Sequence, residues 1–339
     1  MDTSLMKYPP KRSTIDRINS PIRLFSTQVN IRKLNPWFIS GFTDAEGSFL
    51  LEVRRDSTCR AGWLIVARFS ITLHQRDLEL LQSIQAYFGG VGRISTGGKD
   101  TLSYRINSQM DIKRWVLPHF DRYPLITEKQ ADYLLFREAV KLVSKKVHLT
   151  IEGINTIVGI RASLNKGLTP ALKEAFPNCV PSPRPLVVDL QIQHPEWVAG
   201  FTSGEGCFMV SVLCVVGRDG YKSGGLVTLR FVIVQHFRCE QLMESLSTFF
   251  GCGKYYAVKD RDHGEFRVHK FSDIIEKIIP FFQTNRIVGV KELDFMDFCK
   301  IADLMQSQKK HLTKEGLEEI KLIKQSMNKG RIADVVPKD

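Results

Sequence analysis

The sequence predicts an α+β protein of two pseudo-symmetric domains, each with a curved antiparallel sheet, helices on one face and the element order α-β-β-α-β-β-α. Two observations favour this fold class. The chain has 339 residues, which suits two domains of about 150 residues each. Its second half also repeats the first, because the segment 36–49 returns as 195–208 and aligns Glu46 with Glu205. We interpret the chain as the covalent version of a two-fold symmetric pair.

The repeat sets the domain boundaries. We assign residues 31–168 to the first domain and 194–332 to the second, and we assign the segment 169–193, which contains five prolines, to a linker. Residues 1–30 form a basic leader that we expect to be disordered, because it lacks helical periodicity and is rich in Ser and Pro. A mitochondrial transit-like segment is the alternative for this leader.

Each domain opens with a helix that is expected to be buried. Asn35 before Pro36 is a typical helix start, with an N-cap residue followed by proline at the first helical position. The helix over 37–45 is apolar on nearly every side, which predicts burial. We expect Gly47 and Gly206 to end the two copies of this helix in a left-handed conformation.

The remaining elements follow in the same order in both copies. Alternating apolar and polar residues predict strands, apolar residues at helical spacing predict helices, and a glycine pair predicts a hairpin turn. In the first domain we expect, in order, strands over 49–53 and 64–73, a helix over 78–88, a hairpin over 93–107 that turns at Gly97-Gly98, and helices over 111–119 and 127–145.

The charge balance indicates a polyanionic partner. The chain carries 48 Lys and Arg residues against 36 Asp and Glu residues, a formal net charge of +12. Such a chain is attracted to nucleic acid or to an anionic membrane surface. No apolar run is long enough to span a membrane. The seven cysteines include no pair at C-x-x-C spacing, which argues against a disulfide framework or a structural zinc site and indicates a reducing compartment.

Both copies of the first helix carry two small residues four positions apart, which places them on one face and allows the helices to pack closely. These interface candidates are Gly41, Ala45, Gly200 and Gly204. Close packing would bring Glu46 and Glu205 together at the helix ends, where two carboxylates repel and a cation relieves the repulsion. Oxygen ligands of this kind suit Mg²⁺. The alternative is that both glutamates are ordinary helix-end residues that point to solvent.

The segments 39–47 (ISGFTDAEG) and 198–206 (VAGFTSGEG) resemble the two signature helices of the LAGLIDADG homing endonucleases. The later Lys-x-x-Asp helices are similar to those of single-chain, two-repeat members from fungal mitochondrial introns. The resemblance implies a monomeric mitochondrial enzyme that hydrolyses DNA at a long asymmetric site, with a staggered double-strand cut across the minor groove. Mg²⁺ is the expected cofactor, Mn²⁺ is expected to substitute for it, and Ca²⁺ is expected to support binding with little cleavage.

The resemblance also assigns the metal site. The family's acidic position falls on Glu46 and Glu205. The expected metal ligands are Glu46, Glu205, Ala45 and Gly204. One departure from the family's pattern is that Asp44 is replaced by Ser203 in the second copy. Because this position usually caps a helix in the family and does not act in catalysis, the implied activity is unaffected.

Three further residues are catalytic candidates. Gln235 lies at a strand end and matches a water-positioning site of the family. Its counterpart in the first copy is Leu73, which predicts an asymmetric active site. Lys129 and Lys291 begin matched helices near the centre, where they either face the scissile phosphates or are ordinary solvated lysines.

The polar positions of the strands predict the face that reads DNA, because Arg and Lys contact guanine in the major groove and Ser and Thr contact base edges or phosphate. The candidates are Ser48, Leu50, Glu52, Arg54, Arg68, Ser70, Thr72, Arg105, Met209, Ser211, Thr228, Arg230, Lys254, Arg261 and Arg267. A phosphate contact or a solvated charge is the alternative for each. The halves differ at most of these positions, so the DNA site is not expected to be a palindrome. His74 and His236, at strand exits, are interpreted as structural.

A site-specific endonuclease with double-stranded DNA as its partner is the leading hypothesis. One alternative is an RNA maturase that assists splicing of its host intron RNA, and another is a transcriptional regulator that only binds DNA. Loss of an acidic residue would favour these alternatives, whereas Glu46 and Glu205 are both present. No membrane partner is expected.

Overall fold

The computed structural model describes residues 31–187, 190–216, 222–307 and 309–331. The predicted leader over 1–30 lies outside the described residues. None of the helices in these ranges is long and apolar enough to cross a membrane.

The two repeats contain the same series of elements, apart from α7, which has no counterpart among the described elements of the second repeat. Those of the first repeat are α1 (Pro36–Glu46), β1 (Gly47–Arg55), β2 (Trp63–His74), α2 (Leu78–Tyr87), β3 (Arg93–Gly98), β4 (Thr101–Ile106), α3 (Gln109–Asp111), α4 (Leu117–Arg122), α5 (Lys129–Ser144), α6 (Ile151–Ser163) and α7 (Pro170–Ala175). Those of the second are α8 (Pro195–Glu205), β5 (Gly206–Val216), β6 (Lys222–His236), α9 (Glu240–Phe250), β7 (Lys254–Ala257), β8 (His263–Val268), α10 (Phe271–Asp273), α11 (Ile279–Thr284), α12 (Lys291–Gln306) and α13 (Lys314–Gln325).

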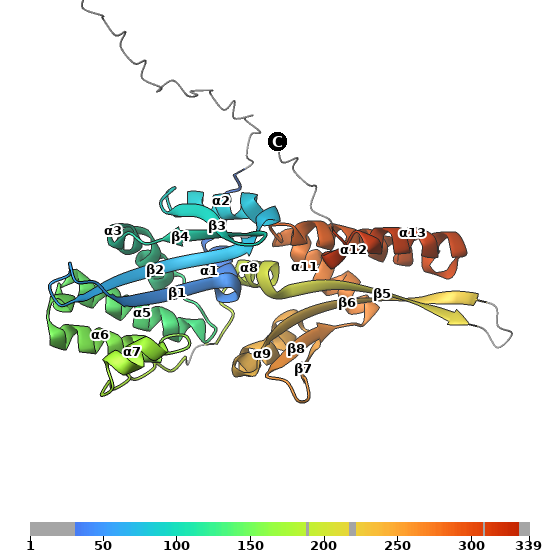
Figure 1. The fold of residues 1–339 in the computed structure, drawn as a ribbon. Helices are drawn as coiled ribbons and strands as arrows, with labels where there is room; N and C mark the ends of the chain where they lie inside the picture. The colour runs from blue at the N-terminus through green and yellow to red at the C-terminus, as the bar shows by residue number, and fades with distance from the viewer. Residues whose placement is uncertain (1–30, 188–189, 217–221, 308, 332–339) are drawn as a thin grey trace, which may run out of the picture. The chain divides into compact units, whose positions relative to one another are not determined.

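Each repeat forms one four-stranded antiparallel sheet, with the strand order β1-β2-β4-β3 in the first repeat and β5-β6-β8-β7 in the second (Figure 1). Each sheet consists of two hairpins of strands that are neighbours in sequence, and the second strand of the first hairpin pairs with the second strand of the other. This arrangement confirms the predicted α+β fold class and the internal repeat.

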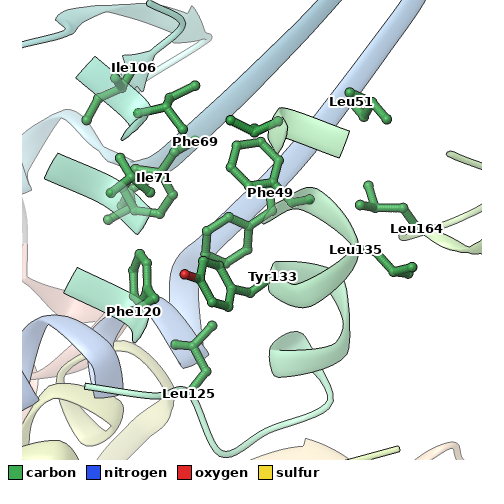
Figure 2. Packing of buried hydrophobic residues seen from close by; sticks show 14 of the residues in the cluster. Phe49, Leu51, Phe69, Ile71, Ile106, Phe120, Leu125, Tyr133, Leu135 and Leu164 are labelled. Carbon is green, nitrogen blue, oxygen red and sulfur yellow. The ribbon is translucent and has the colours of Figure 1, made fainter. Parts of the chain in front are cut away.

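Helices cover one face of each sheet. Phe49 of β1 and Phe69 of β2 point to this face and are fully buried. The ring centroid of Phe49 lies 5.3 Å from that of Phe120 in α4 and 5.4 Å from that of Tyr133 in α5 (Figure 2). The matched Phe208 of β5 lies among the same kind of neighbours. Burial of each such ring contributes about 1.5–3 kcal/mol to folding, so the aromatic layer fixes the helices on the sheet.

The hairpin of the first sheet turns later than predicted. β3 extends through Gly98, so the turn lies at Lys99 and Asp100 and not at Gly97-Gly98. Asp100 adopts the left-handed conformation with φ of 57°, which Asp tolerates better than most residues. The glycine pair instead lies at a register shift between Thr96 and Gly98.

The helical parts of each repeat are longer than predicted. The helix expected over 111–119 spans α3 and α4, and the residues between them, 112–116, form wide π-type turns. Pro118 in α4 has no N–H to donate to the preceding turn, and a widened turn accommodates this loss. The helix expected over 127–145 is α5. Two further helices, α6 and α13, follow at matched places, and the short helix α7 lies in the segment predicted to be a linker.

Gly47 and Gly206 end α1 and α8, but the predicted left-handed conformation is wrong. Their φ angles are −76° and −74°, which is ordinary extended backbone. Glycine is needed here for space, because a Cβ atom on Gly47 would collide with the Thr43 side chain and lie 2.8 Å from its carbonyl oxygen. Thr202 blocks the same position at Gly206. Each helix therefore passes directly into a strand, which places its last residue at the end of the sheet.

The helices α1 and α8 pack against each other in backbone contact (Figure 1). A Cβ atom on Gly41 would overlap the main-chain carbonyl of Trp197, and one on Gly200 would overlap that of Phe38. Gly204 faces the methyl group of Ala45 in the same way. The four small residues predicted as the interface therefore lie between the helices, and they bring the two helix ends together.

Candidate active site

The last residues of α1 and α8 are Glu46 and Glu205, whose side chains are half-buried. The two helix ends are adjacent, because a Cβ atom on Gly204 would lie 3.1 Å from Cγ of Glu46. Burial raises the pKa of both carboxyl groups. The negative charge of Glu46 adds to the effect of burial on Glu205 and raises its pKa to about 7. The two carboxyl groups are therefore close enough for the charge of Glu46 to affect the pKa of Glu205.

Lys129 and Lys291 are the first residues of α5 and α12, and each binds the end of a central helix. The ammonium group of Lys129 donates to the carbonyl oxygens of Thr43 and Ala45, at 3.0 and 3.2 Å. Lys291 donates to the two corresponding carbonyls at the end of α8. Both lysines are half-buried, so the alternative that they are solvated surface lysines is wrong. They supply positive charge where the helix dipole is negative.

The surroundings of the two glutamates are rich in oxygen donors. Ala45 and Gly204 offer only main-chain carbonyls, and these accept hydrogen bonds from the two lysines. In the described part of the chain, no three His, Cys, Asp or Glu side chains lie together in a way that suits a metal ion. The available donor set is therefore two carboxylates with neighbouring carbonyl groups. Hard oxygen donors of this kind fit Mg²⁺, and a cation would relieve the repulsion between the carboxylates.

The two glutamates have different neighbours. The side-chain amide of Gln235 donates to Glu205 at 2.9 Å. Its counterpart Leu73 lines a cleft of about 300 Å³ beside Glu46, together with Asp77. The charge of Asp77 makes a small further contribution to the raised pKa of Glu46. The arrangement is therefore asymmetric in the way that the Gln235–Leu73 pair predicts.

Asp44 accepts hydrogen bonds from both repeats. The main-chain N–H groups of Ile126 and Thr127, just before α5, donate to its carboxylate at 3.0 and 3.2 Å. The Thr127 hydroxyl donates to it at 2.5 Å, and the Trp197 indole donates at 2.9 Å from α8. The helix-capping role implied by the family's pattern thus applies to the chain entering α5 and not to α1 itself. Sequence analysis did not predict the contact with the other repeat.

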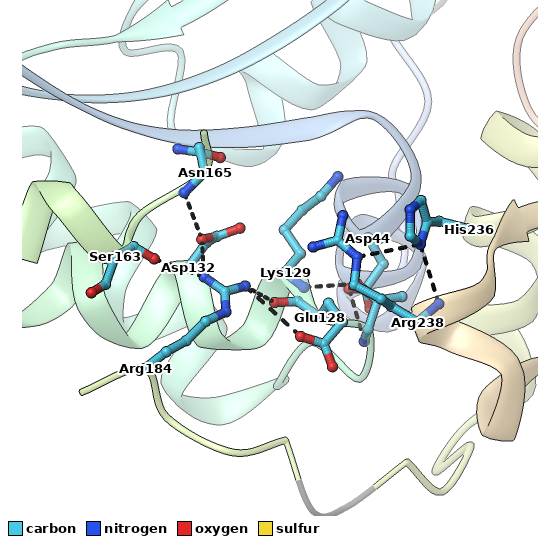
Figure 3. Close-up of polar contacts among 10 residues, drawn as sticks. Asp44, Glu128, Lys129, Asp132, Ser163, Asn165, Arg184, His236 and Arg238 are labelled. Atoms are coloured by element: carbon cyan, nitrogen blue, oxygen red, sulfur yellow. Dashed lines mark hydrogen bonds and ion pairs between the residues drawn. The ribbon is translucent and has the colours of Figure 1, made fainter. Parts of the chain in front are cut away.

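Arg184 holds the first turn of α5 from the segment that follows α7 (Figure 3). Its guanidinium donates to the Asp132 carboxylate at 2.7 Å and to the carbonyls of Glu128 and Ser163, both at 3.0 Å. The main-chain N–H of Asn165 donates to the same carboxylate at 3.1 Å. A corresponding set of bonds lies at the start of α12. The Lys-x-x-Asp motif therefore combines a lysine at the centre with an aspartate that anchors its helix.

The predicted DNA-binding positions of the first repeat lie on the uncovered face of its sheet. Ser48, Ser70 and Arg105 are neighbours in one row across β1, β2 and β4. Arg68 donates to Glu52 on the adjacent strand at 3.3 Å. Ser70 is only 8% exposed, so it is largely covered by its neighbours. The other members of this group are half-buried or exposed.

The second sheet carries arginines whose side chains are held in place. Arg230 donates to the Ser211 hydroxyl at 3.0 Å. Arg267 donates to Glu265 at 2.5 Å and lies over the ring of Tyr256, 5.1 Å from its centroid. The Nε atoms of both arginines are buried and have no hydrogen-bond partner within the described residues. An unpaired buried donor is unfavourable, so these two atoms carry a cost that the described residues do not offset.

One predicted position is misplaced, and one was missed. Arg261 lies in the loop between β7 and β8, so its assignment to a strand is wrong, although it is exposed. The strand β7 ends at Ala257, four residues before Arg261. Arg93 of β3 pairs with Arg105 as Lys254 pairs with Arg267. Arg93 and Lys254 each directly follow a glycine, and this match between the repeats would have identified Arg93 from the sequence.

His74 and His236 act as helix caps. The Nδ1 atom of His74 accepts from the main-chain N–H of Arg76 at 3.3 Å. The Nδ1 atom of His236 accepts from the main-chain N–H of Arg238 at 3.2 Å, as Figure 3 shows. Both contacts start a short 3₁₀ turn after a strand. These contacts agree with the structural interpretation of the two histidines.

The comparisons with known proteins give one consistent family. The model for LAGLIDADG endonucleases matches residues 39–140 and 198–302. The chain is 40% identical over 301 residues to probable intron-encoded endonuclease 3 of Neurospora crassa, a match that covers 88% of this chain and 55% of that protein. The chain thus spans about half the length of this relative.

Similar structures have been solved with DNA. The I-SmaMI LAGLIDADG homing endonuclease bound to cleaved DNA is 47% identical, with a TM-score of 0.85 over 88% of this chain and 99% of that one. I-SmaMI bound to uncleaved DNA in the presence of calcium ions gives 47% identity and a TM-score of 0.84, over 88% of this chain and 100% of that one.

Proposed function

Because the chain belongs to the LAGLIDADG endonuclease family, we propose that it is a site-specific DNA endonuclease that makes a staggered double-strand cut in a long asymmetric site. The observation that carries the proposal is the convergence of Glu46 and Glu205 at the ends of two helices in backbone contact. A pair of carboxylates on a pseudo-two-fold axis suits a duplex, whose two strands are also related by a two-fold axis. The minor groove is only about 6 Å wide, so one compact centre reaches the phosphates of both strands.

We propose Mg²⁺ as the cofactor, with Mn²⁺ able to replace it. Glu46 and Glu205 would hold the ion, with the carbonyls of Ala45 and Gly204 beside them. When bound, a divalent ion activates water and neutralises charge in phosphodiester hydrolysis. I-SmaMI was solved on uncleaved DNA in the presence of calcium ions, which supports the expectation that Ca²⁺ permits binding with little cleavage.

The chain's own residues prepare this centre. Gln235 fixes the orientation of the Glu205 carboxylate by donating to it, and its own carbonyl oxygen is held by the main-chain N–H of His236 at 3.1 Å. The second N–H of its amide group can donate to a water molecule. Lys129 and Lys291 hold the helix ends in place, and their charges keep the two carboxyl groups more readily ionised. Leu73 leaves the other side of the centre without a polar partner of this kind, so the two half-sites are chemically different.

The uncovered faces of the two sheets form the proposed DNA-binding surface. The net charge of +12 favours a polyanion, and the guanidinium groups of Arg230 and Arg267 supply positive charge on the second sheet. The two sheets carry different residues at matched positions, which supports an asymmetric target. We further propose that the enzyme acts as a monomer, because one chain carries both repeats. We propose the mitochondrion as its location, since its Neurospora relative is named as intron-encoded.

A cleavage assay tests the proposed function. The purified chain is incubated with a plasmid that carries the intronless form of its host gene, with Mg²⁺, Ca²⁺ or EDTA. We expect linear product with Mg²⁺ only, and we expect a retarded complex in gel shifts with Ca²⁺. Specific binding to host intron RNA without any DNA cleavage would contradict the endonuclease proposal and favour an RNA maturase.

A further inference from the structure

The helices α5 and α12 begin with the two central lysines, and the N–H groups just before each lysine need acceptors. In the first repeat, the Asp44 carboxylate accepts from two of these N–H groups. In the second repeat, Ser203 occupies the matched position and accepts from only one, that of Val288, at 3.1 Å. The Ser203 hydroxyl donates its own proton to the Ala199 carbonyl. The second repeat therefore lacks the carboxylate that supports the start of this helix in the first.

A carboxylate from the other repeat accepts from a neighbouring N–H group at the start of α12. Asp77 ends the 3₁₀ turn η1 (Gln75–Asp77) of the first repeat, and its Oδ1 atom accepts from the main-chain N–H of Val290 at 2.7 Å. Gly289 permits this approach, because a Cβ atom there would lie 2.7 Å from the same oxygen. Its φ of +88° is also unfavourable for other residues. Val290 directly precedes Lys291, so the contact supports the residue that enters the active centre.

The residue matched to Asp77 in the second repeat is not a carboxylate. The sequence HQRD over 74–77 matches HFRC over 236–239, which aligns Asp77 with Cys239. Cys239 lies beside the start of α5, where burial raises the pKa of its thiol and the main-chain N–H of Glu128 opposes this effect. Helix α5 thus has a carboxylate from its own repeat and a thiol from the other, whereas α12 has a hydroxyl from its own repeat and a carboxylate from the other.

We propose that Asp77 supplies, from the opposite repeat, the carboxylate that is missing at Ser203, and that it is the positioning residue for Lys291. The inference rests on the proposed function, because Lys291 matters for its place beside Glu46 and Glu205. The role of Asp77 is that of a hydrogen-bond acceptor for the first turn of α12. Because Asp77 supports only one of the two lysines, its loss weakens one half-site and leaves the other intact.

The test uses a duplex whose two strands carry different fluorophores, so that cleavage of each strand is measured separately. Replacing the carboxylate by a weaker acceptor (Asp77→Cys) should slow one strand about tenfold relative to the other, the size expected for a lost helix cap. Asp77→Asn keeps an acceptor oxygen in place and should restore the ratio to within about threefold. The matched control Cys239→Ala should leave that strand unaffected, because it alters the start of α5.

A second variant moves the carboxylate to the position that it has in the first repeat. In Asp77→Cys/Ser203→Asp the arrangement at α12 copies that at α5, and the slowed strand should recover. Ser203→Asp alone should impair the protein, because it places two carboxylates at one helix start. Hydrogen exchange of the segment 286–293 should rise in Asp77→Cys and return in the double variant, which gives a readout independent of cleavage.

Equal slowing of both strands by Asp77→Cys, or no recovery in the double variant, would overturn the positioning role. DNA affinity in Ca²⁺ should stay unchanged in all variants, and a parallel loss of affinity would assign Asp77 to the general fold. The wild-type chain in the same assay separates the two proposals. If it cuts neither strand, the proposed function fails, and the inference about Asp77 fails with it.

Discussion

The indole N–H of Trp197 in α8 donates a hydrogen bond to the Asp44 carboxylate in α1, at a distance of 2.9 Å. Both side chains are almost wholly buried, with exposed fractions of 1% and 2%. The bond joins the repeats at Asp44, two residues before Glu46 in α1. A buried carboxylate stays favourable only while its hydrogen bonds are made, so this contact fixes the two helices relative to each other.

Loss of this donor should destabilise the protein. We expect Trp197→Phe to lower the free energy of unfolding by about 1–3 kcal/mol, because the Asp44 carboxylate loses one of its donors inside the protein. Urea unfolding followed by circular dichroism measures the change. Trp37→Phe makes the same chemical change at a half-buried site and serves as the control, with a smaller expected loss. Equal losses in the two variants would show that the bond to Asp44 contributes little.

Removal of either carboxylate from the centre should impair cleavage but not DNA binding. Glu46→Gln and Glu205→Gln each keep the shape of the side chain and remove one charge from the centre. We expect either change to abolish or severely slow cleavage, while most of the specific DNA affinity remains. Plasmid cleavage and gel shifts measure the two activities, and the exposed Glu138→Gln is the control. Cutting at the wild-type rate by either variant would remove that glutamate from the mechanism.

His119 should make stability depend on pH. Its ring is 7% exposed, contacts the hydroxyls of Ser40 at 3.2 Å and Tyr87 at 2.8 Å, and has its pKa lowered by burial to about 3. Below the unfolded value of about 6.5, the unfolded chain binds a proton that the folded chain does not. The stability present above that value should therefore fall as the pH drops toward 3, by up to about 1.4 kcal/mol per pH unit.

The second repeat provides the control for this pH effect. It carries Phe281 at the position matched to His119, with Ala199 and Phe249 in place of the two hydroxyl residues. The rings of Phe249 and Phe281 meet edge to face at 5.6 Å, as those of the first-repeat pair do at 5.3 Å. The triple variant Ser40→Ala/Tyr87→Phe/His119→Phe should lose this part of the pH dependence. An unchanged slope in urea unfolding between pH 7 and pH 4, roughly the window set by these pKa values, would contradict the assignment.

The helix interface should not tolerate one added methyl group. A Cβ atom on Gly41 would overlap the main-chain carbonyl of Trp197, which cannot move without shifting α8. We expect Gly41→Ala to lower the free energy of unfolding by about 1–3 kcal/mol or more. Gly98→Ala is the control, because the nearest atom to its added Cβ would be 3.4 Å away, and its effect should stay within about 0.5 kcal/mol. Thermal unfolding of the two variants distinguishes these outcomes, and similar midpoints would argue against tight packing at Gly41.

The internal repeat made much of the fold and the centre predictable. Small residues and a glutamate at the same spacing in both copies predict a close helix pair that ends in two carboxylates, and Glu46 and Glu205 do lie together. The glycine that follows each helix is equally visible in the sequence, but the reason why glycine is needed there is not. At Gly47 the sequence predicted a left-handed turn, and only the position of Thr43 shows that lack of space is the reason.

The supports of the centre could not be predicted, because they come from distant parts of the chain. Asp44 and Trp197 are 153 residues apart, and Asp77 and Val290 are 213 apart. Periodicity describes neighbours within about two helical turns, so it is silent on such pairs. The positions of Lys129 and Lys291 show the same limit. Their spacing from Asp132 and Asp294 was visible, whereas the carbonyl groups that bind them were not.

The backbone contact between α1 and α8 limits how halves of such proteins can be recombined. A hybrid that joins the first half of one family member to the second half of another must keep Gly41 against Trp197 and Gly200 against Phe38. Otherwise the two central helices cannot pack against each other. The residues on the uncovered faces of the sheets take no part in this contact or in the aromatic layer, so they can change one at a time. New target preferences are therefore best sought by varying the sheets, while both central helices are taken from a single parent.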